Sequence, residues 1–148
     1  DPAAMICTHY DSKKKIIYVF DELYERELTN DILAEKIKEK ISRQYILCDS
    51  AEPKSIKELQ QYGIKALPAK KGKDSVLFGI QWLQQHQIII NTKCKNFKNE
   101  IQQYKWKQDR DGNTLSIPVD RDNHLLDALR YAYSQEMGYK KMKALKRF

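Results

Sequence analysis

The sequence predicts one α/β domain with a mixed sheet flanked by helices. Three observations support this prediction: two strand-like runs open the chain, short apolar runs alternate with helical periods in its middle, and an amphipathic helix closes it. The 148 residues suit a single domain that buries its core without disulfides. No apolar run approaches the ~20 residues of a membrane span, so we expect neither a membrane segment nor a signal peptide.

The first third of the chain predicts a hairpin and then a helix. Residues 3–9 form one strand-like run, residues 11–13 supply turn chemistry, and residues 15–20 are rich in β-branched and aromatic side chains. Apolar residues at helical spacing then begin after Thr29, which suits the position before a helix, and end near Ile41.

The middle of the chain predicts alternating strands and helices. The short apolar runs at 45–48 and 64–67 are typical of buried parallel strands, and residues 88–90 predict a strand or a strand edge. Between the first two runs, a proline and a glycine bound a helix over 53–63. Apolar residues at helical spacing predict a further helix around 76–83.

The last third predicts a helix, a hairpin and a closing helix. We expect a helix over 93–105 and a closing helix over 123–136. Between them, Asp111-Gly112 is a hairpin turn that joins residues 104–108 to residues 114–119.

Composition sets the organisation of the chain and its expected charge partners. We divide the chain into a folded domain, 1–136, and a basic tail, 137–148. The net charge of +7 and the pI near 9.2 favour polyanions such as nucleic acid as partners, without proving one. Cys7, Cys48 and Cys94 lack the spacing of a zinc site, so we expect three reduced thiols, with Cys48 buried.

Asp49 is the first candidate site residue. It follows an apolar run directly, and in open α/β sheets ligands bind at the carboxyl ends of strands. An aspartate that faces a core without a partner is costly, which favours a function. A turn acid or helix cap ahead of Pro53 explains its position equally well.

The predicted closing helix is the second candidate. His124, Asp127 and Tyr131 share one face of it, because residues three and four apart are neighbours on a helix. The apolar stripe that contains Leu125 and Leu129 lies on another face. From periodicity alone, a solvated polar face is the simpler interpretation of the three polar side chains.

A basic segment at 69–76 is the third candidate. It places a glycine and several lysines just ahead of a predicted helix, and a helix N-terminus with nearby cations suits phosphate. Taken alone, the segment is explained as well by an ordinary basic surface loop.

In their order and spacing, these segments resemble motifs of the nuclease domain of phage large terminase subunits. Residues 48–56 resemble the second acidic motif of that family, and residues 123–132 resemble its C-terminal acidic motif. Residues 70–76, with 79–80 after them, resemble its lysine–glycine–serine stretch. The resemblance extends to about residue 136. It implies a ribonuclease H-like mixed sheet and an endonuclease that cuts concatemeric double-stranded DNA during genome packaging.

The resemblance also implies the metal ligands. Asp49 and Asp127 would bind two divalent cations, Mg²⁺ or Mn²⁺, and His124 would act as a further ligand or a proton carrier. The chemistry agrees, because clustered carboxylates repel unless a cation lies between them and hard cations prefer oxygen ligands. Two metals ~3.5–4 Å apart can activate water and stabilise the leaving oxygen of a phosphodiester.

DNA binding is expected along the lysine stretch and the hairpin. Lysines there would hold backbone phosphates rather than read bases. The expected DNA-binding residues are Lys70, Lys71, Lys73, Ser75, Lys105, Lys107 and Arg110. Glu22 is either an accessory acid or, more simply, a surface turn acid, and Trp82 and Trp106 are expected to pack rather than to stack on bases.

One family feature has no counterpart in the sequence. The first acidic residue of the family lies on a strand ahead of the Asp-Pro pair that Asp1-Pro2 matches. We therefore expect the first, central strand to be missing, the metal site to be incomplete, and residues 1–148 to have little or no nuclease activity. The resemblance further implies an upstream ATPase domain, a small terminase subunit and a portal as partners, and the cytoplasm of an infected or lysogenic bacterial host as the location.

Two alternatives stay open. A junction resolvase or transposase relative would keep the fold and change the role, although the lysine–glycine–serine stretch argues against it. A non-catalytic DNA-binding module that docks packaging partners is the alternative outside enzymes.

Overall fold

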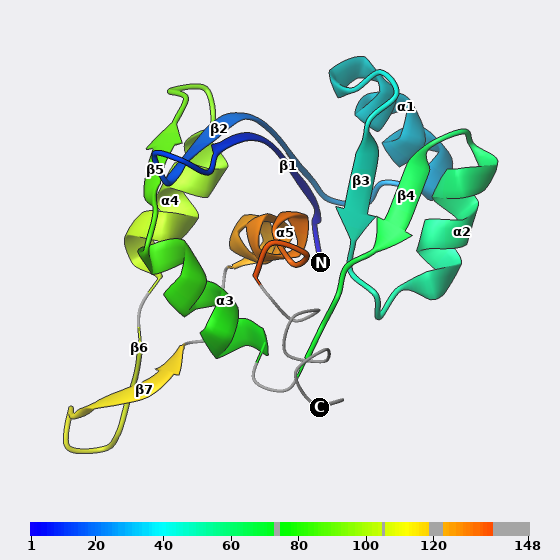
Figure 1. The fold of residues 1–148 in the computed structure, drawn as a ribbon. Helices are drawn as coiled ribbons and strands as arrows, with labels where there is room; N and C mark the ends of the chain where they lie inside the picture. Colours follow the sequence, from blue (N-terminus) through cyan, green and yellow to red (C-terminus); the bar gives the residue numbers. More distant parts are fainter. Residues whose placement is uncertain (73–74, 105, 119–122, 138–148) are drawn as a thin grey trace, which may run out of the picture.

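The structure is a computed structural model, and it describes residues 1–72, 75–104, 106–118 and 123–137 (Figure 1). Its order of strands and helices confirms the mixed α/β class. The elements are β1 (Ala3–Asp11), β2 (Ile16–Glu25), α1 (Asn30–Lys40), β3 (Tyr45–Cys48), α2 (Pro53–Gln61), β4 (Lys65–Pro68), α3 (Ser75–Gln84), β5 (Gln87–Ile90), α4 (Lys95–Gln103), β6 (Trp106–Gln108), β7 (Thr114–Pro118) and α5 (His124–Ala132). None of the helices in the described ranges has the length and apolarity to cross a membrane.

The largest differences from the predicted boundaries are at the ends of β2 and α5. β2 continues to Glu25 rather than ending near residue 20, because its pairing with β1 continues past a register shift between Cys7 and Thr8. α5 ends at Ala132 rather than near residue 136, and turns follow it.

The described strands form three separate groups. β2 is the middle strand of a three-stranded sheet, antiparallel to β1 and parallel to β5. β3 and β4 make a parallel pair, and β6 and β7 make the predicted hairpin. Within the described part of the chain, β1 and β3 thus pair with a neighbouring strand on one side only.

The larger core lies between the three-stranded sheet and helices α3, α4 and α5. The largest fully buried side chains of the described residues all belong to this core: Phe97, Ile17, Leu125, Leu129, Val19 and Cys94. Trp82 packs against the same core, with its ring centroid 5.6 Å from that of Tyr133, in agreement with its predicted packing role.

A smaller core lies between the β3–β4 pair and helices α1 and α2. Its buried members are Ala34, Ile37, Ile56, Leu59, Ile64 and Ala66. The parallel pairing agrees with the prediction for β3, but the strand is less buried than its apolar run suggested, because only one face of the pair is covered. On the other face, Tyr45 is 64% exposed and Leu67 is 37% exposed.

A groove of about 670 Å³ lies between these two parts of the molecule. Residues 3–9 of β1 and residues 45–48 of β3 line it, together with side chains of α1 and α2. His124, Ala128 and Tyr131 of α5 also line it. β1 and β3, which each pair on one side only within the described part of the chain, are therefore the two strands that border the groove.

Candidate functional site

Asp49 lies at the end of β3 and also lines the groove. Its carboxylate accepts hydrogen bonds from the backbone N–H of Ala51 at 3.0 Å and from Nζ of Lys71 at 2.5 Å. The first bond makes Asp49 a turn acid ahead of α2, as one interpretation expected. The second makes it half of an ion pair with Lys71.

Asp127 lies in the first turn of α5 and pairs with Arg130 one turn later. Nη2 of Arg130 is 2.6 Å from Oδ1 of Asp127, and the arginine side chain is only 7% exposed. Gly79 of α3 makes room for this arginine, because a Cβ there would lie 2.9 Å from Cδ of Arg130. The glycine that follows the lysine stretch thus has a packing role beside the candidate site.

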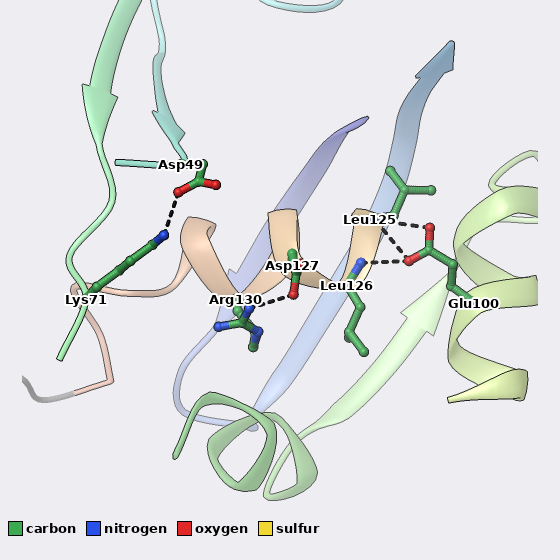
Figure 2. Close-up of polar contacts among 7 residues, drawn as sticks. All are labelled: Asp49, Lys71, Glu100, Leu125, Leu126, Asp127 and Arg130. Carbon is green, nitrogen blue, oxygen red and sulfur yellow. Dashed lines mark hydrogen bonds and ion pairs between the residues drawn. The ribbon is translucent and has the colours of Figure 1, made fainter. Parts of the chain in front are cut away.

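The two carboxylates lie within electrostatic reach of the same side chains. Although partial burial raises the pKa of Asp49, the hydrogen bond from Lys71 and the charges of Lys71 and Arg130 lower it overall. Burial raises the pKa of Tyr131, and the charges of Asp127 and Asp49 raise it further. Figure 2 shows Lys71 directed at Asp49 and Arg130 directed at Asp127. Asp49 and Asp127 therefore act electrostatically on the same two residues of α5, Arg130 and Tyr131.

The third candidate ligand, His124, opens α5. It lines the groove, and its ring centroid is 6.4 Å from that of Tyr24. Over the described ranges, no group of three or more His, Cys, Asp and Glu side chains is arranged to hold a metal ion. This chain thus supplies two carboxylates and a histidine near the groove, with a cationic side chain on each carboxylate.

The basic loop after β4 is attached to α5. The backbone N–H of Lys70 donates to Oγ of Ser134 at 3.2 Å, and Nζ of Lys71 lies 5.2 Å from the ring centroid of Tyr131. Ser75 is the first residue of α3. Of the expected phosphate-binding lysines, Lys70 and Lys71 are therefore positioned beside the candidate site.

The other expected DNA-binding residues lie elsewhere. Arg110 is exposed in the turn between β6 and β7, where Gly112 adopts a φ of +81°. Lys73, Lys105 and the side chain of Lys107 lie outside the described residues, as does the side chain of Trp106.

Two glutamates have roles that the sequence did not predict. Glu22 lies within β2 rather than in a surface turn, and its carboxylate accepts the backbone N–H groups of Asn96 and Phe97 at the start of α4. Glu100 is 7% exposed on the inner face of α4. A charged residue three positions after the buried Phe97 was the available signal, because helical spacing places both on the same face.

Comparisons with known proteins identify the family to which this fold belongs. The family model described as a terminase RNase H-like domain matches residues 1–135. The large terminase subunit of Bacillus phage SPP1 is 35% identical over 142 residues, which are 93% of this chain and 34% of that protein. The large subunit of the PBSX phage terminase of Bacillus subtilis is 31% identical over 131 residues, which are 87% of this chain and 30% of that protein.

A solved structure agrees with the sequence relatives. The crystal structure of the nuclease domain of the SPP1 large terminase with bound Mn has a TM-score of 0.86 and is 35% identical. The match covers 92% of this chain and 80% of that one. This likeness confirms the expected ribonuclease H-like fold and the resemblance to large terminase subunits. The chain spans about a third of the length of the curated relatives that it matches.

Proposed function

This chain belongs to the terminase RNase H-like domain family, and we propose that it cuts concatemeric double-stranded DNA with divalent metal ions during the packaging of a phage genome. The observation that carries the proposal is that one buried arginine serves both carboxylates: Arg130 forms an ion pair with Asp127 of α5, and its charge also lowers the pKa of Asp49 at the end of β3. Mn bound to the SPP1 nuclease domain supports the choice of metal.

The donor set of this chain fits a hard divalent cation. Asp49 and Asp127 offer carboxylate oxygens, which Mg²⁺ and Mn²⁺ prefer, and His124 precedes Asp127 by one helical turn. When bound, a pair of such cations supplies an activated water and stabilises the leaving oxygen of the phosphodiester. Arg130 stays beside Asp127 as a buried positive charge. Lys71, whose side chain is 37% exposed, holds a DNA phosphate close to Asp49.

A strand from elsewhere in the parent protein fills the groove between β1 and β3. Each of these strands lines the groove and has one side without a partner among the described strands. In Figure 1, the arrow of β3 points toward the end of the molecule where β1 begins. A strand antiparallel to β1 and parallel to β3 would therefore end beside Asp49, where a carboxylate could complete the metal site. Residues 1–148 alone should then bind metal weakly and cut slowly.

The wider setting follows from the family. The parent protein carries an ATPase domain ahead of this one and works with a small terminase subunit and a portal in the cytoplasm of a bacterial host. Phosphate contacts come from the lysine stretch, Lys70, Lys71 and Lys73 with Ser75, and from Lys105, Lys107 and Arg110. These contacts bind DNA without strong sequence preference, because they reach the backbone rather than the bases.

Plasmid cleavage in Mn²⁺ by the full-length parent subunit tests the proposal. We expect Asp49→Asn and Asp127→Asn each to abolish cleavage while DNA binding is retained, because each removes a metal-ligating charge. Glu35→Gln, on an exposed position of α1, is the matched control and should cut like the wild type. Undiminished cleavage in either aspartate variant would remove the nuclease assignment for this site. DNA binding by a wild-type protein that never cuts would favour a docking module.

A further inference from the structure

The carboxylate of Glu100 joins two helices. Its Oε1 accepts the backbone N–H groups of Leu125 at 2.9 Å and Leu126 at 3.0 Å, and its Oε2 lies 3.1 Å from the same nitrogen of Leu125 (Figure 2). The residue is 7% exposed, so these bonds form out of contact with bulk water. A side chain of α4 thus binds the backbone at the start of α5.

This contact takes the place of the ordinary helix cap. The first backbone N–H groups of a helix lack partners within the helix, and the residue before it commonly satisfies one of them. In α5 that residue is Asn123, whose side chain makes no capping hydrogen bond. Glu100 satisfies the second and third N–H groups instead, and its negative charge lies at the positive end of the helix dipole.

The capped turn also carries the candidate ligands. His124 precedes the two residues whose N–H groups Glu100 binds, and Asp127 follows them. We propose that Glu100 is a positioning residue, which fixes the first turn of α5 so that His124 and Asp127 are presented to a divalent cation. This inference rests on the proposed function, because it concerns the same metal site.

The energetics favour a role in positioning over one in stability alone. Burial raises the pKa of Glu100 despite the hydrogen bonds from Leu125 and Leu126, so the ionised carboxylate is costly at this place. The charge of Asp127 raises that pKa further, and His124 lowers it. A buried charge of this kind is weak support for folding stability, and its best-attested use is to specify one arrangement of the elements around it.

The chain contains a matched control for this idea. Glu22 likewise accepts the second and third N–H groups of α4, with its Oε1 2.9 Å from the nitrogen of Asn96 and its Oε2 3.2 Å from that of Phe97. That helix carries none of the candidate ligands, although Glu100 lies one turn further along it. Glu22→Gln should therefore remove a comparable cap while the Glu100 carboxylate keeps its hydrogen bonds to the first turn of α5.

The experiment compares the Mn²⁺ affinity of Glu100→Gln, Glu22→Gln and wild-type full-length subunit by calorimetry, with urea unfolding of each. We expect Glu100→Gln to weaken Mn²⁺ binding about tenfold or more, the range typical of lost partners behind metal ligands, and to lower kcat more than it changes KM for DNA. Glu22→Gln should bind Mn²⁺ as the wild type does, even where it lowers the urea midpoint equally.

Each remaining outcome has a definite meaning. Unchanged Mn²⁺ affinity in Glu100→Gln, or equal losses in both variants, would overturn the positioning role and leave the proposed function standing. A wild type that binds no Mn²⁺ would overturn the proposed function itself. If Glu100→Gln does not fold, Glu100→Asp replaces it, because it keeps the charge and withdraws the carboxylate by one methylene. The inference then requires weaker Mn²⁺ binding in that variant and is overturned by wild-type affinity.

Discussion

Around β1, β2 and β5 the chain closes its own core, whereas around β3 and β4 it leaves one face of the sheet open. The first part holds the largest fully buried side chains of the described residues, among them Phe97 and Leu129. In the second part, Tyr45 of β3 remains 64% exposed. The candidate ligands come from both parts, since Asp127 belongs to a helix of the larger core and Asp49 follows a strand of the smaller one.

This difference indicates how the site is assembled. Asp127 is held by a buried arginine and lies in a turn that Glu100 caps, so its position is set within the larger part. Asp49 is held by the half-exposed Lys71 at the border of the groove. We infer that the smaller part is the adjustable half of the site and that a strand in the groove would fix it.

The largest expected effect comes from the same substitution in each core. Leu129→Ala removes a side chain that is 0% exposed, and it should cost about 4–5 kcal/mol of unfolding free energy. Leu59→Ala, at 5% exposure beside the open groove, should cost about 2–3 kcal/mol because its surroundings can collapse or admit water. Urea unfolding measures both values. If Leu59→Ala lost as much unfolding free energy as Leu129→Ala, or more, the proposed difference between the two cores would be contradicted.

A smaller effect is expected from the two ion pairs. Arg130→Met removes the partner of Asp127 in a mostly buried place, and it should cost about 2 kcal/mol. Lys71→Met breaks a pair whose side chains are 37% and 39% exposed, and solvent screening should hold its cost below about 1 kcal/mol. Chemical denaturation at low and high salt checks both, and only the Lys71 effect should fade with salt. If the cost of Arg130→Met also fell with salt, the placement of Arg130 in the buried interior of the larger part would be contradicted.

The smallest effect is a dependence of stability on pH that separates the two parts. Because the pKa of Asp49 is lowered in the folded protein, this residue stabilises the fold at pH values above 3.8, its ordinary pKa. The stabilisation is lost as the pH falls through the pKa of the folded state. The pKa of Glu100 is raised in the folded protein, so the sign is opposite. Its contribution to the free energy of unfolding is fully present below pH 4.5 and is lost as the pH rises through the pKa of the folded state. The stability advantage of the wild type over Glu100→Gln should thus narrow as pH rises above 4.5. Urea midpoints of the two proteins between pH 3 and pH 7 measure this difference in stability, and a difference that grows as the pH rises would contradict the prediction.

Much of the fold followed from local patterns. Alternation and helical spacing predicted the hairpin, the parallel pair and α5, because those patterns reflect which face of each element is buried. They did not predict the open face of β3, because exposure of Tyr45 depends on what lies across the groove rather than on the strand itself.

The candidate site was predictable only in part. Asp49 and Asp127 were predicted as ligands because each follows or occupies an element in a recognisable motif, and this remains a prediction. The partners of Asp127 and of the α5 backbone were not found: Arg130 looked like an ordinary helical residue, and Glu100 lies 25 residues before the N–H group of Leu125 that it binds. Contacts of this kind depend on how helices pack, and helical periodicity carries no information about a partner on another helix.

One measurement tests the central claim that the two parts bind a cation together. Mn²⁺ binding should be measured by calorimetry for full-length wild type, Asp49→Asn, Asp127→Asn and the double variant. The account predicts that each single substitution removes most of the affinity and that the double variant is little worse than either, since both ligands serve one site. Independent, additive losses, or wild-type affinity in either single variant, would contradict it.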